Sequence, residues 1–493
     1  MKCSKKLLAA VLCSSMLLAA GCAAADTPEK LDIYPEVSAN VPAAAGTDGL
    51  IQQSAAPEAP LYNRGTIYDI NGRVIVSTVQ QSVSDAYRSF SEEYASTLAN
   101  LFADTANGFD EVFSPVLRQR NVEAVNIYDS IGQSVRLSLD AELSSKLVGL
   151  LEAENIRGSV VVMRKDGSIA AMASAAALDL LRLGSEEGYA ESLDGTGAFT
   201  NRTLALYPPG SVFKMASEVI ADMSGINVLT DEGKIYRGGS SIQNWDWEQG
   251  GYYPVDRSRL AAFASSSNVY FAKVFEMTGQ ETVQRILADV FMFGDEIEIA
   301  CDFGTLTNTL SIESDDDLMR TGFGQANVRT SPLYLAALTR EAVYGSLVRP
   351  FMLYQIVNTR DYTQQTGEGS KPYDTLAEIP AECREHLREC MAAVGSELDL
   401  SVPEGYTLYA KTGTAQTQSA DCLYICGGLV SDHDDIASMA DCGDYSGYPE
   451  IGSYIIVMQI ENSDDLELSY ASSAAPYYEK IISLVVPAQE GEQ

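Results

Sequence analysis

Histidine is scarce in this chain and positive charge is in deficit. With only two histidines, His386 and His433, among 493 residues, a Ser-His-Asp triad is excluded unless His433 reaches the site. Cys422, Cys426 and Cys442 lie near His433 but lack the tight spacing of zinc ligands, so we expect no metal site. The 68 acidic residues against 33 basic ones give a net charge of −35. A field of that sign repels phosphate backbones, so we expect no nucleic-acid partner.

The N-terminal apolar run is too short to span a membrane. It extends from Leu7 to Ala20, 14 residues, whereas a bilayer core of about 30 Å needs about 20. It follows a lysine-rich start and ends in Leu-Ala-Ala-Gly-Cys, so residues 1–21 are expected to be a lipoprotein signal peptide. A diacylglyceryl thioether on Cys22 would then anchor the protein at the extracytoplasmic face of the cell membrane. The alternative is a plain signal peptide with an incidental cysteine.

The other cysteines are spaced in ways that limit disulfide pairing. Cys422 and Cys426 fall in an expected strand, where four residues span roughly 13 Å. Cys383 and Cys390 fall in an expected helix, about 10 Å apart along its axis. Both separations exceed disulfide reach. Any bridge must therefore join different segments, and free thiols remain an alternative.

The composition divides the rest of the chain into four parts. Residues 22–60 are rich in Ala, Pro and small polar residues, and we expect a disordered tether. Residues 61–140 are expected to form a small, non-catalytic N-terminal α+β module. Residues 141–487 are long enough for a main domain with its own core, and residues 488–493 form a tail.

Short apolar runs bounded by turn residues predict strands. In the N-terminal module, two short strands are expected around Asn71-Gly72. In the main domain, strands are expected at residues 159–163, 168–172, 407–412, 423–430 and 453–460, and helices at residues 141–154 and 475–485. Strands at both ends of the main domain with helical material between them predict an α+β fold, in which an antiparallel sheet joins both ends and is flanked by helices.

Ser211 is the strongest candidate for a nucleophile. Lys214 is the only lysine of this chain with a serine three positions earlier. Pro208-Pro209-Gly210 stops the preceding element, so Ser211 is expected to open a helical run that continues to Asp222. Positions i and i+3 share a helix face, which places the amine beside the hydroxyl. A lysine can act as the base of a serine nucleophile if burial and a second cation lower its pKa.

Two further motifs supply the groups that this chemistry needs. Lys411-Thr412-Gly413-Thr414 ends an expected strand, where Lys411 is the second cation and the N–H of Thr414 an oxyanion donor. Ser266 and Asn268, in Ser-Ser-Ser-Asn, could relay a proton and hold a substrate amide. Ser266 follows Ser211 by 55 residues, and Lys411 follows Ser266 by 145 residues.

The three motifs together resemble those of the penicillin-binding proteins and β-lactamases. Asn63–Asp69 resembles the Arg-Gly-x-Ile-x-Asp opening of class B penicillin-binding proteins. Leu137–Asp140, Asp166–Ser174 and Gly322–Gln325 are similar to further landmarks of that family, and the resemblance covers residues 61–485. One departure is Tyr424-Ile425-Cys426-Gly427, where the family usually carries Trp-Phe-x-Gly.

The resemblance implies a penicillin-binding transpeptidase fold for residues 141–487 and a peptidoglycan D,D-transpeptidase activity. Ser211 would attack the penultimate D-Ala carbonyl of a stem peptide, and an amine would resolve the acyl-enzyme. Thr412 and Gly413 would line the substrate with Thr414. β-Lactams would acylate the same serine, no cofactor would be needed, and a SEDS-family glycosyltransferase would be the partner. The alternatives are a D,D-carboxypeptidase or β-lactamase-type hydrolase, and a β-lactam sensor.

Overall fold

The fold was determined as a computed structural model of the 493-residue chain. The structure describes residues 62–82, 85–102, 108–119, 131–175, 178–179, 182, 188–193, 197–237, 239–251, 253–357, 364–365, 374–416, 421–434, 452–461, 466 and 468–487. The predicted signal peptide, the lipidation site Cys22, the tether and the C-terminal tail lie outside these residues. No helix among the described residues is both long and apolar enough to cross a membrane.

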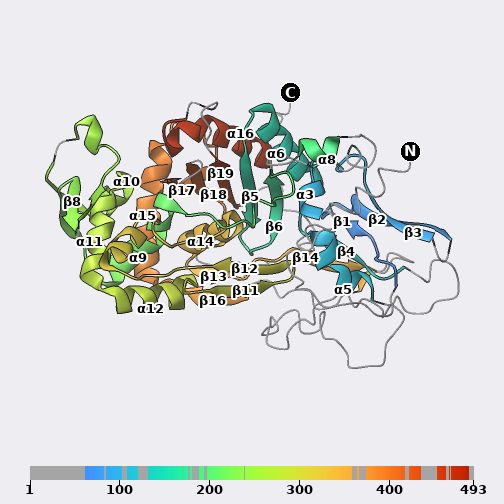
Figure 1. The fold of residues 1–493 in the computed structure, drawn as a ribbon, viewed down its shortest axis with the longest axis horizontal. Coiled ribbons are helices and arrows are strands. Elements are labelled where there is room, and N and C mark those ends of the chain that lie inside the picture. Colours follow the sequence, from blue (N-terminus) through green and yellow to red (C-terminus); the bar gives the residue numbers. More distant parts are fainter. Residues whose placement is uncertain are drawn as a thin grey trace, which may run out of the picture.

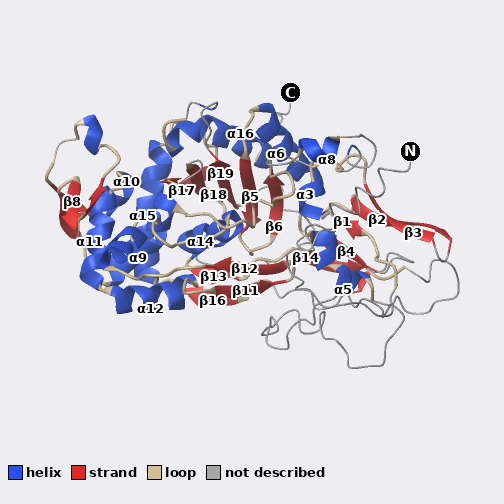
Figure 2. Cartoon of the chain, viewed as in Figure 1, coloured by secondary structure: helices blue, strands red, loops and turns tan. Residues whose placement is uncertain are grey.

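The centre of the molecule is a five-stranded antiparallel sheet with the order β17-β18-β19-β5-β6 (Figures 1 and 2). Its strands are β5 (Gly158–Arg164), β6 (Ile169–Ser174), β17 (Tyr406–Ala415), β18 (Cys422–Ser431) and β19 (Tyr454–Glu461). Each corresponds to a predicted strand, and β19 pairs with β5 across about 290 residues of sequence. The prediction that the sheet joins both ends of the main domain is confirmed.

Helices cover both faces of this sheet. The predicted helices are present as α6 (Ala141–Ala153) and α16 (Ala475–Val485), and α14 (Pro332–Tyr344) is completely buried. A Cβ at Gly427 would meet Tyr478 of α16, whereas a Cβ at Gly428 would meet Val343 of α14. Successive residues of a strand point to opposite faces. Therefore α16 and α14 lie on opposite faces of β18.

A helical region beside β17 carries the first two motifs (Figure 2). The 3₁₀ turn η2 (Gly210–Phe213) leads into α9 (Lys214–Met223), and α10 (Arg259–Ala264) is separated by a short turn from α11 (Asn268–Thr278). The other helices of the region are α12 (Gln280–Phe291), α13 (Asp315–Thr321) and α15 (Ala381–Glu397). α15 packs against β17, where a Cβ at Gly395 would lie 1.9 Å from the carbonyl oxygen of Leu408.

Short strand pairs complete the main domain. They are β7 (Val228–Asp231) with β10 (Val255–Ser258), β8 (Lys234–Arg237) with β9 (Ser240–Gln243), β11 (Ile297–Cys301) with β12 (Gly304–Asn308), and β13 (Ser346–Val348) with β16 (Thr375–Glu378). The β8–β9 hairpin forms one end of the elongated molecule in Figure 1.

A second, six-stranded sheet has the order β15-β14-β4-β1-β2-β3. Its strands are β1 (Ile67–Tyr68), β2 (Val74–Ser82), β3 (Asp85–Phe90), β4 (Ser134–Leu137), β14 (Leu353–Val357) and β15 (Gln364–Gln365), and the short helices α3 (Ala99–Phe102), α4 (Phe109–Val112) and α5 (Ser114–Leu117) accompany it. β1 and β2 are the strands predicted around Asn71-Gly72. The sequence did not predict β3, β4, β14 or β15, and the last two come from the segment that was predicted to form the main domain.

The Arg-Gly-x-Ile-x-Asp segment has a structural role in this sheet. Arg64 is buried and pairs with Asp110, with 2.7 Å between Nη1 and Oδ2. A Cβ at Gly65 would lie 1.8 Å from the carbonyl oxygen of Gln133, so only glycine fits there. The Asp69 carboxylate accepts the N–H groups of Arg73 and Ala141.

The five cysteines within the described residues, Cys301, Cys383, Cys390, Cys422 and Cys426, are all free thiols. As predicted, Cys422 and Cys426 lie in a strand, and Cys383 and Cys390 lie in a helix. Cys442, the third of the cysteines that lie near His433 in the sequence, is outside the described residues.

Candidate active site

Ser211 lies in a tight turn that is pressed against β17, the edge strand of the main sheet. Gly210 has a φ of +57°, and a Cβ there would lie 2.5 Å from the carbonyl oxygen of Thr414. A Cβ at Gly413 would lie 2.7 Å from the backbone nitrogen of Val212. Glycine at both positions therefore allows the turn and the strand to approach each other closely.

The local structure at Ser211 differs in one respect from the predicted helical run. Ser211 lies inside the 3₁₀ turn η2, and the α-helix begins only at Lys214. The predicted i, i+3 contact is still made, since Lys214 Nζ lies 2.8 Å from Ser211 Oγ. A 3₁₀ turn stacks positions i and i+3 more directly than an α-helix does, so this turn favours the contact.

Lys214 is completely buried and is surrounded by oxygen atoms from the turn between α10 and α11. Its Nζ lies 2.7 Å from the carbonyl oxygen of Ser266, 3.2 Å from Ser266 Oγ and 2.7 Å from Asn268 Oδ1. Ser266 has a φ of +55°, which is uncommon for a residue with a side chain. In this conformation its carbonyl and its hydroxyl both reach the lysine amine.

Lys411 reaches the same hydroxyl from β17. Its Nζ lies 3.1 Å from Ser266 Oγ and 2.9 Å from the carbonyl oxygen of Thr412. The amine also lies over the ring of Phe263, 5.4 Å from the ring centroid. Lys411 is completely buried. The Ser266 hydroxyl therefore connects two buried lysine amines.

Burial determines the charge of these amines. Burial lowers the pKa of Lys214 well below its ordinary value, nearby Lys411 lowers it further, and Asp231 opposes the shift. Burial also lowers the pKa of Lys411, to about 7. Burial and the neighbouring Lys411 thus both favour the neutral form of the Lys214 amine.

A neutral Lys214 amine has a definite hydrogen-bonding pattern in this site. It keeps two N–H donors and gains a lone pair. The carbonyl oxygen of Ser266 and Asn268 Oδ1 can only accept, so they take both N–H groups. The lone pair is then left for the hydroxyl proton of Ser211. A base for a serine nucleophile requires this arrangement.

The structure thus brings the predicted site residues of all three motifs together. Thr412 accepts from Lys411, Gly413 touches the Ser211 turn, and the Thr414 carbonyl lies beside Gly210. The role of Thr412, Gly413 and Thr414 in holding a substrate oxyanion stays a prediction.

Besides Phe263, three further aromatic residues at the site were not predicted. Tyr424 of β18 is buried and donates a hydrogen bond to the carbonyl of Pro208, just before the Ser211 turn. Trp245 is exposed, and its Nε1 donates to the carbonyl of Ser265 at 3.2 Å. Tyr470 lies against Trp245, with ring centroids 6.1 Å apart. Only Tyr424 had a sequence signal, as a departure from the usual Trp-Phe-x-Gly.

Neither histidine serves Ser211 within the part of the chain that the structure describes. His386 of α15 hydrogen-bonds to Asp222 at 2.6 Å and to Arg259 at 3.2 Å. His433 is exposed just after β18 ends, and its backbone N–H donates to Ser431 Oγ. Neither ring is hydrogen-bonded to the Ser211 hydroxyl, which instead lies against the amine of Lys214.

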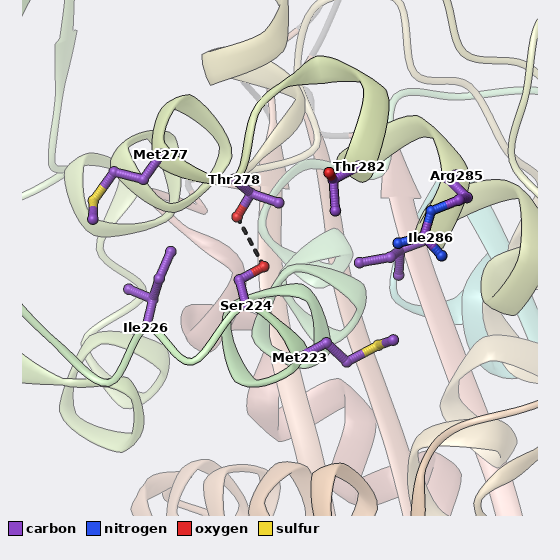
Figure 3. Close-up of a pocket in the computed structure, with 8 residues that line it drawn as sticks. All are labelled: Met223, Ser224, Ile226, Met277, Thr278, Thr282, Arg285 and Ile286. Carbon is purple, nitrogen blue, oxygen red and sulfur yellow. Dashed lines mark hydrogen bonds between the residues drawn. The ribbon is translucent and has the colours of Figure 1, made fainter.

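A pocket of about 410 Å³ lies at the other end of α9 (Figure 3). Its lining residues are Met223, Ser224, Ile226, Met277, Thr278, Thr282, Arg285 and Ile286. Ser224 and Thr278 are joined across it by a 3.0 Å hydrogen bond between their hydroxyl oxygens. Met223 ends the helix that Lys214 begins, nine residues or about 14 Å along the axis. The pocket is therefore separate from the lysine–serine cluster.

The sequence around this cluster matches a known protein family. Residues 158–424 match the family described as penicillin binding protein transpeptidase domain. The chain is similar to penicillin-binding protein 3 of Bacillus subtilis (strain 168), at 26% identity over 307 residues, which cover 59% of this chain and 43% of the relative. The chain thus spans less than half the length of that relative.

Solved structures show the same fold. The D,D-transpeptidase domain of a peptidoglycan glycosyltransferase from Eggerthella lenta matches with a TM-score of 0.66 and 17% identity, over 87% of this chain and 99% of that one. PBPA from Mycobacterium tuberculosis matches with a TM-score of 0.67 and 18% identity, over 86% of this chain and 100% of that one. The predicted fold, an antiparallel sheet flanked by helices, is confirmed. Because the family match covers more than half of its residues, the chain belongs to the penicillin-binding protein transpeptidase domain family.

Proposed function

We propose that this protein is a serine D,D-transpeptidase that cross-links peptidoglycan stem peptides and is acylated by β-lactams. The observation that carries the proposal is the position of Lys214, whose amine contacts the Ser211 hydroxyl at 2.8 Å while two acceptor oxygens occupy its N–H groups. Membership of the transpeptidase family supports it.

In the proposed mechanism, Ser211 Oγ attacks the carbonyl carbon of the penultimate D-Ala and its proton passes to Lys214. The ester bond forms as the bond to the terminal D-Ala breaks. The leaving amine needs a proton. The Ser266 hydroxyl lies 3.2 Å from the amine of Lys214, which received the Ser211 proton, and 3.1 Å from the amine of Lys411. It therefore connects the leaving amine to Lys214. An amine from a second stem peptide then attacks the ester, and the steps run in reverse to release Ser211.

Related structures support acylation by β-lactams. Penicillin-binding protein A from M. tuberculosis has been solved as an imipenem acyl-enzyme complex and as a penicillin G acyl-enzyme complex, and these match this chain with TM-scores of 0.67 and 0.65. A β-lactam ring opens on attack, so its leaving amine stays attached to the acyl group. An adduct on Ser211 would therefore add the whole mass of the antibiotic.

The fate of the acyl group is the question that an experiment must answer. Full-length protein is incubated with a stem pentapeptide ending in D-Ala-D-Ala and an amine acceptor, and the products are resolved by mass spectrometry. A transpeptidase releases D-Ala and forms an acceptor–peptide conjugate, whereas a carboxypeptidase forms the tetrapeptide. If the wild-type protein forms neither product at a level above that of Ser211→Ala, both enzyme activities are excluded.

We further propose that the protein is a class B penicillin-binding protein, anchored outside the cytoplasm through lipidated Cys22 and paired with a SEDS-family glycosyltransferase. The segment from Arg64 to Asp69 and the six-stranded sheet, in which β1 to β4 come from the N-terminal part of the chain, support the class. Metabolic labelling with a fatty acid tests the anchor, because Cys22→Ala should lose the label while a Cys13→Ala control keeps it. Co-purification of the glycosyltransferase with the full-length protein tests the partner.

A further inference from the structure

A buried carboxylate–amide pair lies directly beneath the turn that carries Ser266 and Asn268. Asp231 ends β7 and Asn244 follows β9, and they are 0% and 3% exposed. The side-chain amide of Asn244 donates to both carboxylate oxygens of Asp231, at 3.0 Å each. This fixes the orientation of the amide, so its oxygen must face away from the carboxylate.

That amide oxygen holds the start of α11. Asn244 Oδ1 accepts the backbone N–H groups of Asn268 at 2.8 Å and Val269 at 3.0 Å. The first N–H groups of a helix have no partner within the helix, and here a side chain outside the helix supplies one. A flipped Asn244 amide would place N–H groups against N–H groups and would lose both bonds.

Asp231 holds the same turn through a second bond. Ser267 Oγ donates to Asp231 Oδ2 at 2.7 Å and accepts the N–H of Tyr270 at 3.0 Å as the N-cap of α11. Arg257 also donates to Asp231 Oδ2, at 3.0 Å, and partly balances the buried charge. The three residues that follow Ser266, which are Ser267, Asn268 and Val269, are therefore tied to one buried pair.

The turn needs such support because Ser266 adopts an unfavourable backbone conformation. A φ of +55° lies in the left-handed region, which residues with a side chain seldom adopt. This conformation places the carbonyl and hydroxyl of Ser266 on the Lys214 amine, and Asn268 adds its Oδ1. Three of the four oxygen atoms around the amine therefore depend on the geometry of this turn.

We infer that Asp231 and Asn244 are positioning residues for the Ser211 acylation step, which they support by holding the Ser266–Asn268 turn against Lys214. This inference rests on the proposed function. Neither residue is hydrogen-bonded to Ser211, and both are hydrogen-bonded to the turn.

The test measures the acylation rate constant and the noncovalent dissociation constant of a fluorescent penicillin with the full-length protein. Asp231→Asn places an N–H group where Asp231 now accepts, and a misplacement of about 1 Å near the reacting atoms costs about 100-fold in rate. We expect the acylation rate constant to fall about 10- to 100-fold, with the dissociation constant little changed. Asn244→Asp, which sets two buried carboxylates against each other, should fall as far.

The matched control is Asp302→Asn, which alters a buried carboxylate in the β11–β12 turn that accepts the N–H groups of Met352 and Leu353. It should lower the melting temperature without changing the acylation rate constant. Asp231→Asn acylating at the wild-type rate would overturn the inference. If Asp231→Asn does not fold, Ser267→Ala removes one link and should slow acylation about 10-fold, and an unchanged rate would again overturn it. Failure of the wild-type protein to be acylated would instead contradict the proposed function.

Discussion

Gly413→Ala adds one methyl group where β17 meets the Ser211 turn. The new Cβ would lie 2.7 Å from the Val212 nitrogen and 2.8 Å from Val212 Cγ1, whereas ordinary contact begins at 3.4 Å. The strand and the turn must therefore separate by about 0.7 Å. Gly413 does not have a positive φ, so alanine fits its backbone conformation and the whole effect comes from the contact.

The expected loss follows from this displacement. A misplacement of about 1 Å at reacting groups costs about 100-fold, so we expect acylation by penicillin to slow about 30- to 100-fold. The assay is the second-order rate constant for labelling of the full-length protein by a fluorescent penicillin, with the melting temperature measured in parallel. Acylation of Gly413→Ala at the wild-type rate would refute the argument that close approach of β17 and the turn sets the site geometry.

Gly428→Ala provides the control in the neighbouring strand. Its Cβ would lie 2.7 Å from Val343 Cγ2, a side-chain atom of α14 on the face of the sheet opposite α16. Overpacking a core costs about 1–3 kcal/mol, so this variant should be less stable than wild type. Its acylation rate should stay close to that of wild type, because no part of the Ser211 turn moves.

Three further predictions concern the lysines and the cysteines. Lys214→Arg should slow acylation about 10²- to 10⁴-fold in the same labelling assay, because arginine stays protonated and cannot accept the Ser211 proton; slowing of less than 10-fold would count against the base role. Lys411, with a pKa of about 7, is charged below that pH and loses its charge as the pH rises through it. The rate of acylation by an anionic penicillin should therefore fall above about pH 7, Lys411→Arg should abolish this fall, and an identical pH profile in both proteins would contradict the assignment. In denaturant without reductant, iodoacetamide should alkylate Cys301, Cys383, Cys390, Cys422 and Cys426, and peptide mapping that finds any of them in a disulfide would be at odds with the structure.

The main sheet could be predicted because its strands carry strong local signals. β5 and β6 are apolar runs joined by a turn, and β18 is apolar and buried throughout. The helix at Ala141–Ala153 begins after Asp140, whose side chain caps it as such residues commonly do. The pairing of β14 with β4 carries no such signal, because it joins residues more than 200 positions apart and each strand is only a few residues long.

The candidate site could be predicted only in part, for a similar reason. Ser211, Lys214 and Lys411 stand in short motifs, so their spacing reveals them. Asp231 and Asn244 contact the turn through hydrogen bonds to a segment more than 20 residues away, and nothing in their local sequence predicts these contacts. The extent of η2 also escaped prediction, because 3₁₀ and α-helical turns share the same short-range residue preferences.

The central claim is that Ser211 is the residue that becomes acylated, and intact mass spectrometry with peptide mapping tests it most directly. Full-length protein is incubated with excess penicillin G, quenched, weighed intact and then digested. We predict one adduct per chain, of the whole mass of the antibiotic, on the peptide that contains Ser211, and none with Ser211→Ala. No adduct on the wild-type protein, or an adduct that persists in Ser211→Ala, would contradict the account.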